Sequence, residues 1–198
     1  MKQTDDTHQS RLELGCAYER YIGFVLEHQK WEVIYRGILR GPADRGRDLI
    51  CTKGKTRLIV QCKRLQPIRQ VEREVLVKFE TSLSEYKRKF PDESQARLGG
   101  FDAFDAIVKG KLYTTSTLTA EAKRIAFDAG IAFEECFSLK NYPPIKCPKP
   151  KPDNSAWYYL PSDYAYDSIR MRPWLGDEYI FTQEEAKKMG FVHATPQV

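Results

Sequence analysis

Three polar residues at the ends of one predicted β-hairpin could together bind a metal ion and polarise a water molecule. Asp48 lies near the start of the run 47–51, and Gln61 and Lys63 end the run 57–63. Side chains alternate along a strand, so Gln61 and Lys63 share one face. Hairpin pairing then brings Asp48 opposite the end of the second run. A carboxylate, an amide oxygen and an ammonium group at one strand edge can together hold a hard divalent cation and a polarised water.

The elements around this hairpin alternate between helical and extended patterns. Apolar residues recur at helical spacing over 11–29, which includes Glu19, and a strand is expected over 31–35. Glycine-containing residues 37–46 are expected to form a loop that brings Asp44, Arg45 and Arg47 next to Asp48. Later residues predict a basic helix over 68–90, strand segments at 106–108 and 112–115, a helix over 119–129 and a strand over 131–135.

This order predicts an α/β fold. The strand, helix and strand over 106–135 form a crossover unit with a parallel pair, whereas the hairpin is antiparallel. We therefore expect a mixed β-sheet, antiparallel at the hairpin and parallel at its far side, with helices on both faces.

Composition indicates a protein that can bury a core and does not cross a membrane. The 198 residues are 41% hydrophobic and include 10 Phe, 11 Tyr and 3 Trp. No apolar run approaches the roughly 20 residues of a membrane span, and the first residues lack the apolar core of a signal peptide. The five cysteines form no CxxC pair, which argues against a zinc knuckle or a disulfide framework. We expect a cytoplasmic protein.

The charge distribution and the prolines divide the chain. The last 58 residues carry equal numbers of acidic and basic side chains, so the net charge of +5 falls on the first 140. A basic region permits a nucleic-acid partner without requiring one. Five prolines over 143–154 predict a semi-rigid linker. We expect a main domain over 1–140, a linker over 141–156, and a small aromatic-rich C-terminal module over 157–198, whose role is target recognition or dimer contact.

The ordered set of motifs resembles the Mrr-like branch of the PD-(D/E)xK nucleases, which have the restriction-endonuclease-like fold. The resemblance covers roughly residues 11–136 and rests on the helix with Glu19, Trp31-Glu32-Val33, Gly46-Arg47-Asp48-Leu49-Ile50 and Val60-Gln61-Cys62-Lys63. The later runs 112–116, 119–129 and 130–133 resemble the second half of that domain. Gln61 stands where the wider family has an acidic residue, a substitution found in the Mrr-like branch.

The resemblance implies a Mg²⁺-dependent endonuclease, with Mn²⁺ as an expected substitute, that cuts double-stranded DNA in defence against foreign DNA. It implies that Asp48, Gln61 and the carbonyl of Cys62 hold the metal ion. Lys63 would orient the attacking water and stabilise the transition state. Because an amide brings no charge, a further carboxylate is needed, and Glu19 is the expected supplement, with Asp44 as a local alternative.

Four arginines are candidates for contacts with the DNA backbone: Arg45, Arg47, Arg64 and Arg69. Double-strand cleavage favours a homodimer with two sites. Three alternatives remain open at this point. One is a junction resolvase or repair nuclease, and another is a catalytically weak nucleic-acid-binding module on a nuclease fold. The third is an enzyme that acts on RNA, since net charge does not distinguish RNA from DNA.

Overall fold

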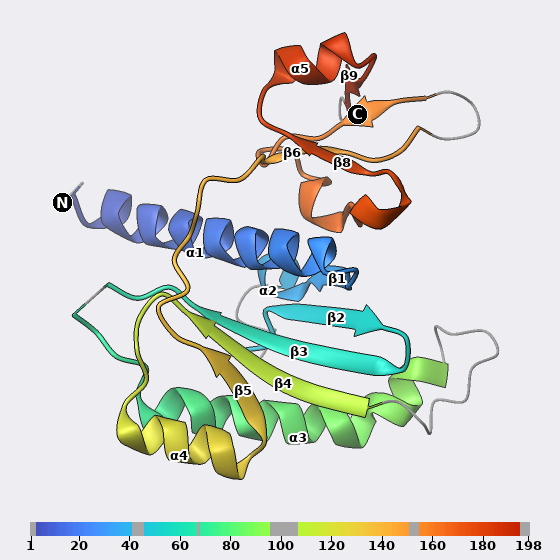
Figure 1. Cartoon of the computed structure of the whole chain (residues 1–198). Coiled ribbons are helices and arrows are strands. Elements are labelled where there is room, and N and C mark those ends of the chain that lie inside the picture. The colour runs from blue at the N-terminus through green and yellow to red at the C-terminus, as the bar shows by residue number, and fades with distance from the viewer. Residues whose placement is uncertain (1–2, 41–45, 67, 96–106, 151–154, 195–198) are drawn as a thin grey trace.

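A computed structural model describes residues 3–40, 46–66, 68–95, 107–150 and 155–194 of the chain (Figure 1). Within these ranges, the first part of the chain forms five strands and four α-helices, and strands β2 and β3 follow one another as a hairpin. Their bounds are α1 Gln3–His28, β1 Glu32–Tyr35, α2 Arg36–Arg40, β2 Leu49–Lys53, β3 Thr56–Lys63, α3 Arg73–Gln95, β4 Ile107–Thr114, α4 Ala120–Asp128 and β5 Ile131–Glu134.

The five strands form one mixed sheet in the order β1-β2-β3-β4-β5. The pairs β1–β2 and β2–β3 are antiparallel, and the pairs β3–β4 and β4–β5 are parallel. This confirms the predicted mixed sheet. The hairpin turn is tighter than expected, because Gly54 takes a φ of +55° and lets β2 and β3 turn over two residues.

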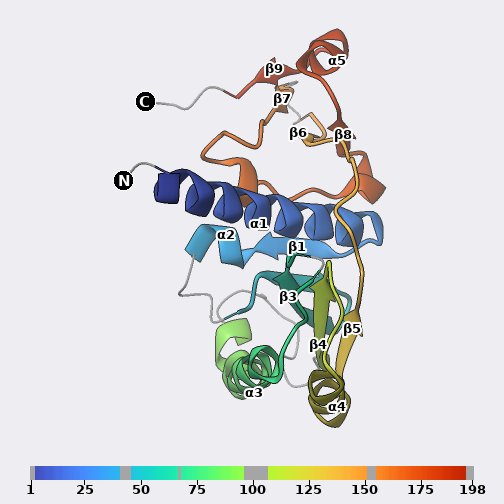
Figure 2. The ribbon, with the colours of Figure 1, turned by 90° about the vertical axis from the view of Figure 1, so that its left-hand side faces the viewer.

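Helices cover both faces of the sheet, as the sequence predicts (Figures 1 and 2). On one face, α1 packs its buried aromatic and aliphatic side chains, such as Tyr18 and Ile22, against Leu49, Val60 and Cys62. On the other face, α3 and α4 close a second core around Ile50, Ile59 and Leu112. Alternation along β3 therefore points Cys62 towards α1, and Gln61 and Lys63 towards the α3 and α4 side.

Several local expectations differ from the structure. The helix expected over 68–90 begins only at Arg73, so residues 68–72 precede α3 and are not helical. Residues 36–40 form the short helix α2 where a loop was expected from Gly37 onward. The expected interruption at 109–111 is absent, because β4 runs unbroken through Gly110. A Cβ at Gly110 would lie 2.7 Å from the Leu83 side chain, so glycine here permits α3 to approach the sheet closely.

The remaining residues form a small unit of short elements. It contains β6 Ile145–Cys147, β7 Trp157–Tyr158, the 3₁₀ helices η3 Tyr166–Ser168 and η4 Pro173–Leu175, β8 Glu178–Ile180, α5 Gln183–Lys188 and β9 Val192–His193. Strand β6 pairs with β8, and β7 pairs with β9. Residues 145–147 were expected in the linker, but they form a buried strand of this C-terminal unit. The unit therefore begins before the proline run ends.

The C-terminal unit lies on the outer side of α1, so this helix is enclosed between the sheet and the unit (Figure 2). Arg20 of α1 donates two hydrogen bonds to Asp167 of η3, at 2.9 and 2.7 Å. Glu27 of α1 accepts hydrogen bonds from Tyr35 of β1 and Tyr179 of β8. Lys146 of β6 is 1% exposed and lies over the ring of Tyr35, with its Nζ 4.5 Å from the ring centroid.

None of the helices in the described ranges is both long enough and apolar enough to cross a membrane.

Candidate active site at the ends of β2 and β3

Asp48 and Gln61 meet because the β2–β3 register places them side by side. Leu49 pairs with Val60, so the antiparallel ladder, continued by one residue, brings Asp48 next to Gln61. The backbone N–H of Cys62 donates a 2.6 Å hydrogen bond to Oδ2 of Asp48. Asp48 is 7% exposed and Gln61 is 4% exposed. The hairpin prediction thus gives the right neighbours, and the carboxylate is held against the strand that carries the other polar residues.

The Gln61 amide is buried with an oxygen that has no hydrogen-bond partner within the described part of the chain. Leaving a buried acceptor unsatisfied costs about 1 to 3 kcal/mol. Its nitrogen side faces Gly46, where a Cβ atom would lie only 2.6 Å from Nε2, and Gly46 takes a φ of +74°. A metal ion that accepts an oxygen ligand would satisfy Oε1, so the donor set fits a hard cation.

Lys63 ends β3 on the same face as Gln61. It is half-buried and pairs with Thr114 in the parallel ladder with β4. The carbonyl of Lys63 accepts a hydrogen bond from the N–H of Thr115, at 3.2 Å. This bond extends the ladder by one residue beyond β4. The Lys63 side chain is therefore attached to a backbone that hydrogen bonds fix in place, at the same end of the sheet as Asp48 and Gln61.

Glu19 reaches the same strand end from the opposite face of the sheet. Burial raises the pKa of the Cys62 thiol well above its ordinary value, and the negative charges of Asp48 and Glu19 raise it further, whereas Lys63 opposes them. The Cys62 thiol therefore lies close enough to Asp48, Glu19 and Lys63 for their charges to affect its pKa. The structure brings Glu19 to the neighbourhood of Cys62 on the α1 side, while Gln61 and Lys63 point to the other side.

The predicted DNA-contacting arginines fall into different environments. Arg64 and Arg69 are exposed just beyond β3. Arg47 is only 8% exposed and lies over the ring of Tyr86, with its Cζ 5.6 Å from the ring centroid. In this structure Arg47 thus packs between the hairpin and α3. Arg45 and the alternative carboxylate Asp44 lie outside the described residues.

Among the residues that the structure describes, no group of three or more His, Cys, Asp and Glu side chains is arranged to hold a metal ion. The candidate ligands are therefore the carboxylates of Asp48 and Glu19, the amide oxygen of Gln61 and the backbone carbonyl of Cys62.

Gly46 and Thr115 lie in motifs found in the sequence, but their supporting roles are seen only in the structure. Gly46 fixes the space available to the Gln61 amide, and its signal is a glycine two positions before Asp48. Thr115 holds the segment after Lys63, because its hydroxyl accepts from Leu65 N and donates to Leu65 O, both at 2.9 Å. Its only signal is the hydroxyl-rich run that follows β4.

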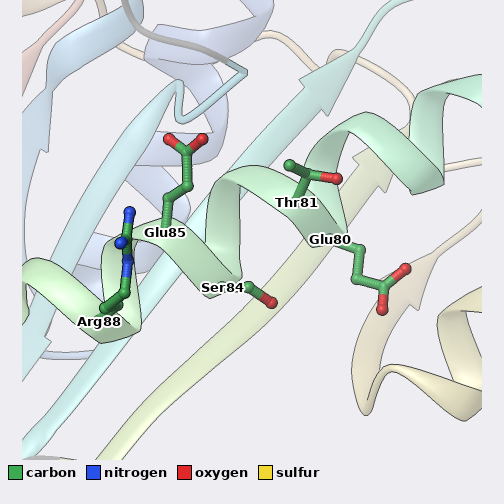
Figure 3. Close-up of a pocket in the computed structure, with 5 residues that line it drawn as sticks. All are labelled: Glu80, Thr81, Ser84, Glu85 and Arg88. Carbon is green, nitrogen blue, oxygen red and sulfur yellow. The ribbon is translucent and has the colours of Figure 1, made fainter.

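A surface hollow on α3 does not include the candidate site. Its lining residues come from that helix alone: Glu80, Thr81, Ser84, Glu85 and Arg88 (Figure 3). None of them was predicted to act in catalysis, and none lies at the strand ends.

Comparison with known proteins gives one family match. Residues 15–90 match the family described as restriction endonuclease, the Mrr catalytic domain. The matched range contains Glu19, Asp48, Gln61, Cys62 and Lys63, and it confirms the resemblance drawn from the sequence. No curated protein matches the chain.

Two solved structures are similar to parts of the chain. EndoMS in its apo form is 18% identical, with a TM-score of 0.33, and the match covers 46% of this chain and 32% of EndoMS. AF1548, a protein of unknown function, is 15% identical, with a TM-score of 0.37, and the match covers 59% of this chain and 56% of AF1548. The chain thus spans less than two thirds of either protein.

Proposed function

We propose that this chain, of which residues 15–90 match the Mrr restriction endonuclease family, is a Mg²⁺-dependent endonuclease that hydrolyses phosphodiester bonds of DNA. One observation carries the proposal beyond this family match. The buried Oε1 atom of Gln61 has no hydrogen-bond partner among the described residues, and Gln61 lies next to the carboxylate of Asp48. A site that binds a cation through oxygen ligands accounts for this unsatisfied atom.

We assign each residue a role that is consistent with its position. Asp48, Gln61 and the carbonyl of Cys62 would hold the metal ion, and Glu19 would add negative charge from α1. When bound, Mg²⁺ supplies positive charge against the charge that develops on the phosphorane, and it makes water a better nucleophile at neutral pH. Mn²⁺, which also binds oxygen ligands, is expected to replace it.

Lys63 acts on the reacting phosphate. Its ammonium group donates hydrogen bonds to the attacking water and to a non-bridging phosphate oxygen, which orients the first and stabilises charge on the second. Asp48, in turn, keeps the end of β3 in place through its hydrogen bond from Cys62 N. Exposed Arg64 and Arg69 are placed to neutralise backbone phosphates beside the scissile bond.

The test is cleavage of supercoiled plasmid by the purified chain in Mg²⁺, in Mn²⁺ and in EDTA. We expect nicked or linear product with either metal and none in EDTA. Asp48→Ala and Lys63→Ala should each abolish cleavage, a loss of at least about 10²-fold, because they remove a metal ligand and the principal electrostatic stabiliser. Circular dichroism and the melting temperature check that the variants remain folded. Normal cutting by either folded variant would show that the site is misassigned.

The same assay distinguishes between the possible biological roles of the protein. Methylated and unmethylated plasmids test a defence function, since an enzyme that restricts foreign DNA should distinguish them. A four-way junction tests resolvase activity, and preferential cutting of the junction would replace the defence proposal. Linear product formed directly from supercoiled DNA would support a dimer with two sites. DNA binding with no cleavage of any substrate would instead support a binding module.

A further inference from the structure

The segment that joins β3 to α3 begins directly after Lys63 and extends beyond the end of the sheet (left side of Figure 1). Most of its described side chains are exposed: Arg64, Gln66, Ile68, Arg69 and Gln70. Ile68 is 90% exposed, although fully burying such a side chain contributes about 1.5 to 3 kcal/mol. Ile68 belongs to none of the three hydrophobic cores formed by the described residues.

This segment is held by hydrogen bonds on both sides of Ile68. Residues 115–119, which connect β4 to α4, make several of these bonds, and within the segment the N–H of Arg69 donates to the carbonyl of Gln66 at 2.9 Å. Before Ile68, the Thr115 hydroxyl bonds both backbone groups of Leu65 at 2.9 Å. After it, the Ser116 hydroxyl donates to the carbonyl of Arg69. Further bonds join Gln70 Nε2 to Thr117 Oγ1, Val71 N to Thr117 O and Thr119 N to Val71 O, at 3.0, 2.9 and 3.0 Å.

These hydrogen bonds hold the backbone on both sides of Ile68 in a defined position. The same strand end carries Lys63, so under the proposed function the segment would lie beside the reacting phosphate. Exposed guanidinium groups at Arg64 and Arg69 lie on either side of Ile68 in sequence, and they suit a polyanion better than an apolar protein surface. An apolar side chain between cations, on a braced backbone, matches the chemistry of residues that press against or between base pairs.

We propose that Ile68 contacts the bases of duplex DNA next to the cleaved bond, while Arg64 and Arg69 contact the adjacent phosphates. This inference rests on the proposed function, because it places the substrate at the end of β3. Ile68, which is not one of the proposed metal ligands, would thereby determine how the duplex is positioned on the protein. Contact with an unpaired or distorted base step should be favoured, because unstacking such a step costs less than unstacking a regular one.

The test compares Ile68→Ser with Ile107→Ser. Ile107 is 56% exposed and pairs with Thr56 at the opposite end of β3 from Lys63, so it offers the same chemical change away from the site. Binding of a fluorescein-labelled 20-base-pair duplex is followed by fluorescence anisotropy in Ca²⁺ without Mg²⁺, and cleavage is followed in Mg²⁺. We expect Ile68→Ser to raise Kd about tenfold, from lost apolar contact. Ile107→Ser should leave Kd unchanged, and Ile68→Leu should restore it.

A 2-aminopurine base in the duplex reports stacking directly. Its fluorescence should rise on binding of the original chain and of Ile68→Leu, and less with Ile68→Ser. Equal Kd values and equal 2-aminopurine signals for the original chain and Ile68→Ser would overturn the inference. So would a change in sedimentation behaviour with unaltered DNA binding, which would assign Ile68 to a protein contact. The binding assay does not need cleavage, so failure of the nuclease proposal is seen separately, in the Mg²⁺ reaction.

Discussion

At the scale of single residues, the candidate site depends on how closely Gly46 approaches Gln61. Gly46 has a positive φ, and a Cβ atom there would meet Gln61 Nε2 at 2.6 Å. Contacts below 3.0 Å force one of the groups to move. The glycine therefore sets the position of the amide whose oxygen is the proposed metal ligand.

We predict that Gly46→Ala lowers both stability and cleavage, whereas Gly54→Ala lowers stability alone. Gly54 also has a positive φ, but a Cβ atom there would meet nothing within 4 Å. Backbone strain should cost each variant about 1 kcal/mol in free energy of unfolding, measured by urea denaturation. Only Gly46→Ala should raise the Mg²⁺ concentration for half-maximal cleavage. Equal Mg²⁺ dependence in the two variants would show that Gly46 does not position Gln61.

At the scale of elements, ion pairs join the C-terminal unit to α1 and to β1. Arg20 and Asp167 form a two-bond pair with side chains 19% and 9% exposed. A second pair, Glu32 with Arg172 at 2.9 Å, also joins the C-terminal unit to the first part of the chain, but both side chains are more than 40% exposed.

We predict that Asp167→Asn destabilises the protein by about 3 kcal/mol, because it leaves the Arg20 charge largely buried without its partner. Arg172→Gln should cost less than about 1 kcal/mol, since exposed ion pairs are screened by water. Chemical denaturation of both variants, together with an Arg20→Gln, Asp167→Asn double-mutant cycle, measures the coupling. A coupling energy near zero would mean that the pair contributes nothing to docking of the C-terminal unit.

The elements also show what local sequence patterns can and cannot predict. The hairpin, the α4 helix with its Thr119 cap and the parallel pair β4–β5 follow from alternation, capping and order, which are local signals. Strand β6 was missed because prolines surround it and its partner β8 lies more than thirty residues away. The approach of Glu19 to Cys62 likewise depends on how α1 packs, which no spacing within the helix specifies. Gln61, Lys63 and Asp48 were brought together correctly because register alone decides their proximity.

At the scale of the whole molecule, the two parts of the chain share a buried polar cluster. Burial raises the pKa of Glu27 to about 7, and the nearby Asp177 raises it too, although Lys146 and hydrogen bonds from Tyr179 and Tyr35 oppose the shift. Burial lowers the pKa of Lys146 to about 8. Lys146 Nζ also donates to the carbonyls of Tyr166 and Ile169, both at 3.0 Å.

We predict that the stability of the original chain falls between pH 5 and pH 7 more than that of Glu27→Gln. A carboxyl whose pKa is above its ordinary value of 4.5 in the folded state binds more protons there than in the unfolded state. Its contribution is therefore present at low pH and is lost as pH rises through about 7. The difference should be on the order of 1 to 3 kcal/mol in free energy of unfolding. The range ends below the pKa of Lys146, so that residue does not titrate within it, and parallel pH profiles would contradict the prediction.

The enclosure of α1 has a consequence for how the chain is made. Tyr179, which bonds Glu27, follows it by 152 residues, so the helix leaves the ribosome long before its outer cover exists. At about 5 to 20 residues per second, translation of that interval lasts roughly eight to thirty seconds. During this time the sheet can form beneath the helix, while Glu27 and Phe24, whose ring centroid lies 5.0 Å from that of Tyr179 in the complete structure, still face water. Until β8 is made, one side of α1 in the nascent protein therefore lacks the side chains that cover it in the complete structure.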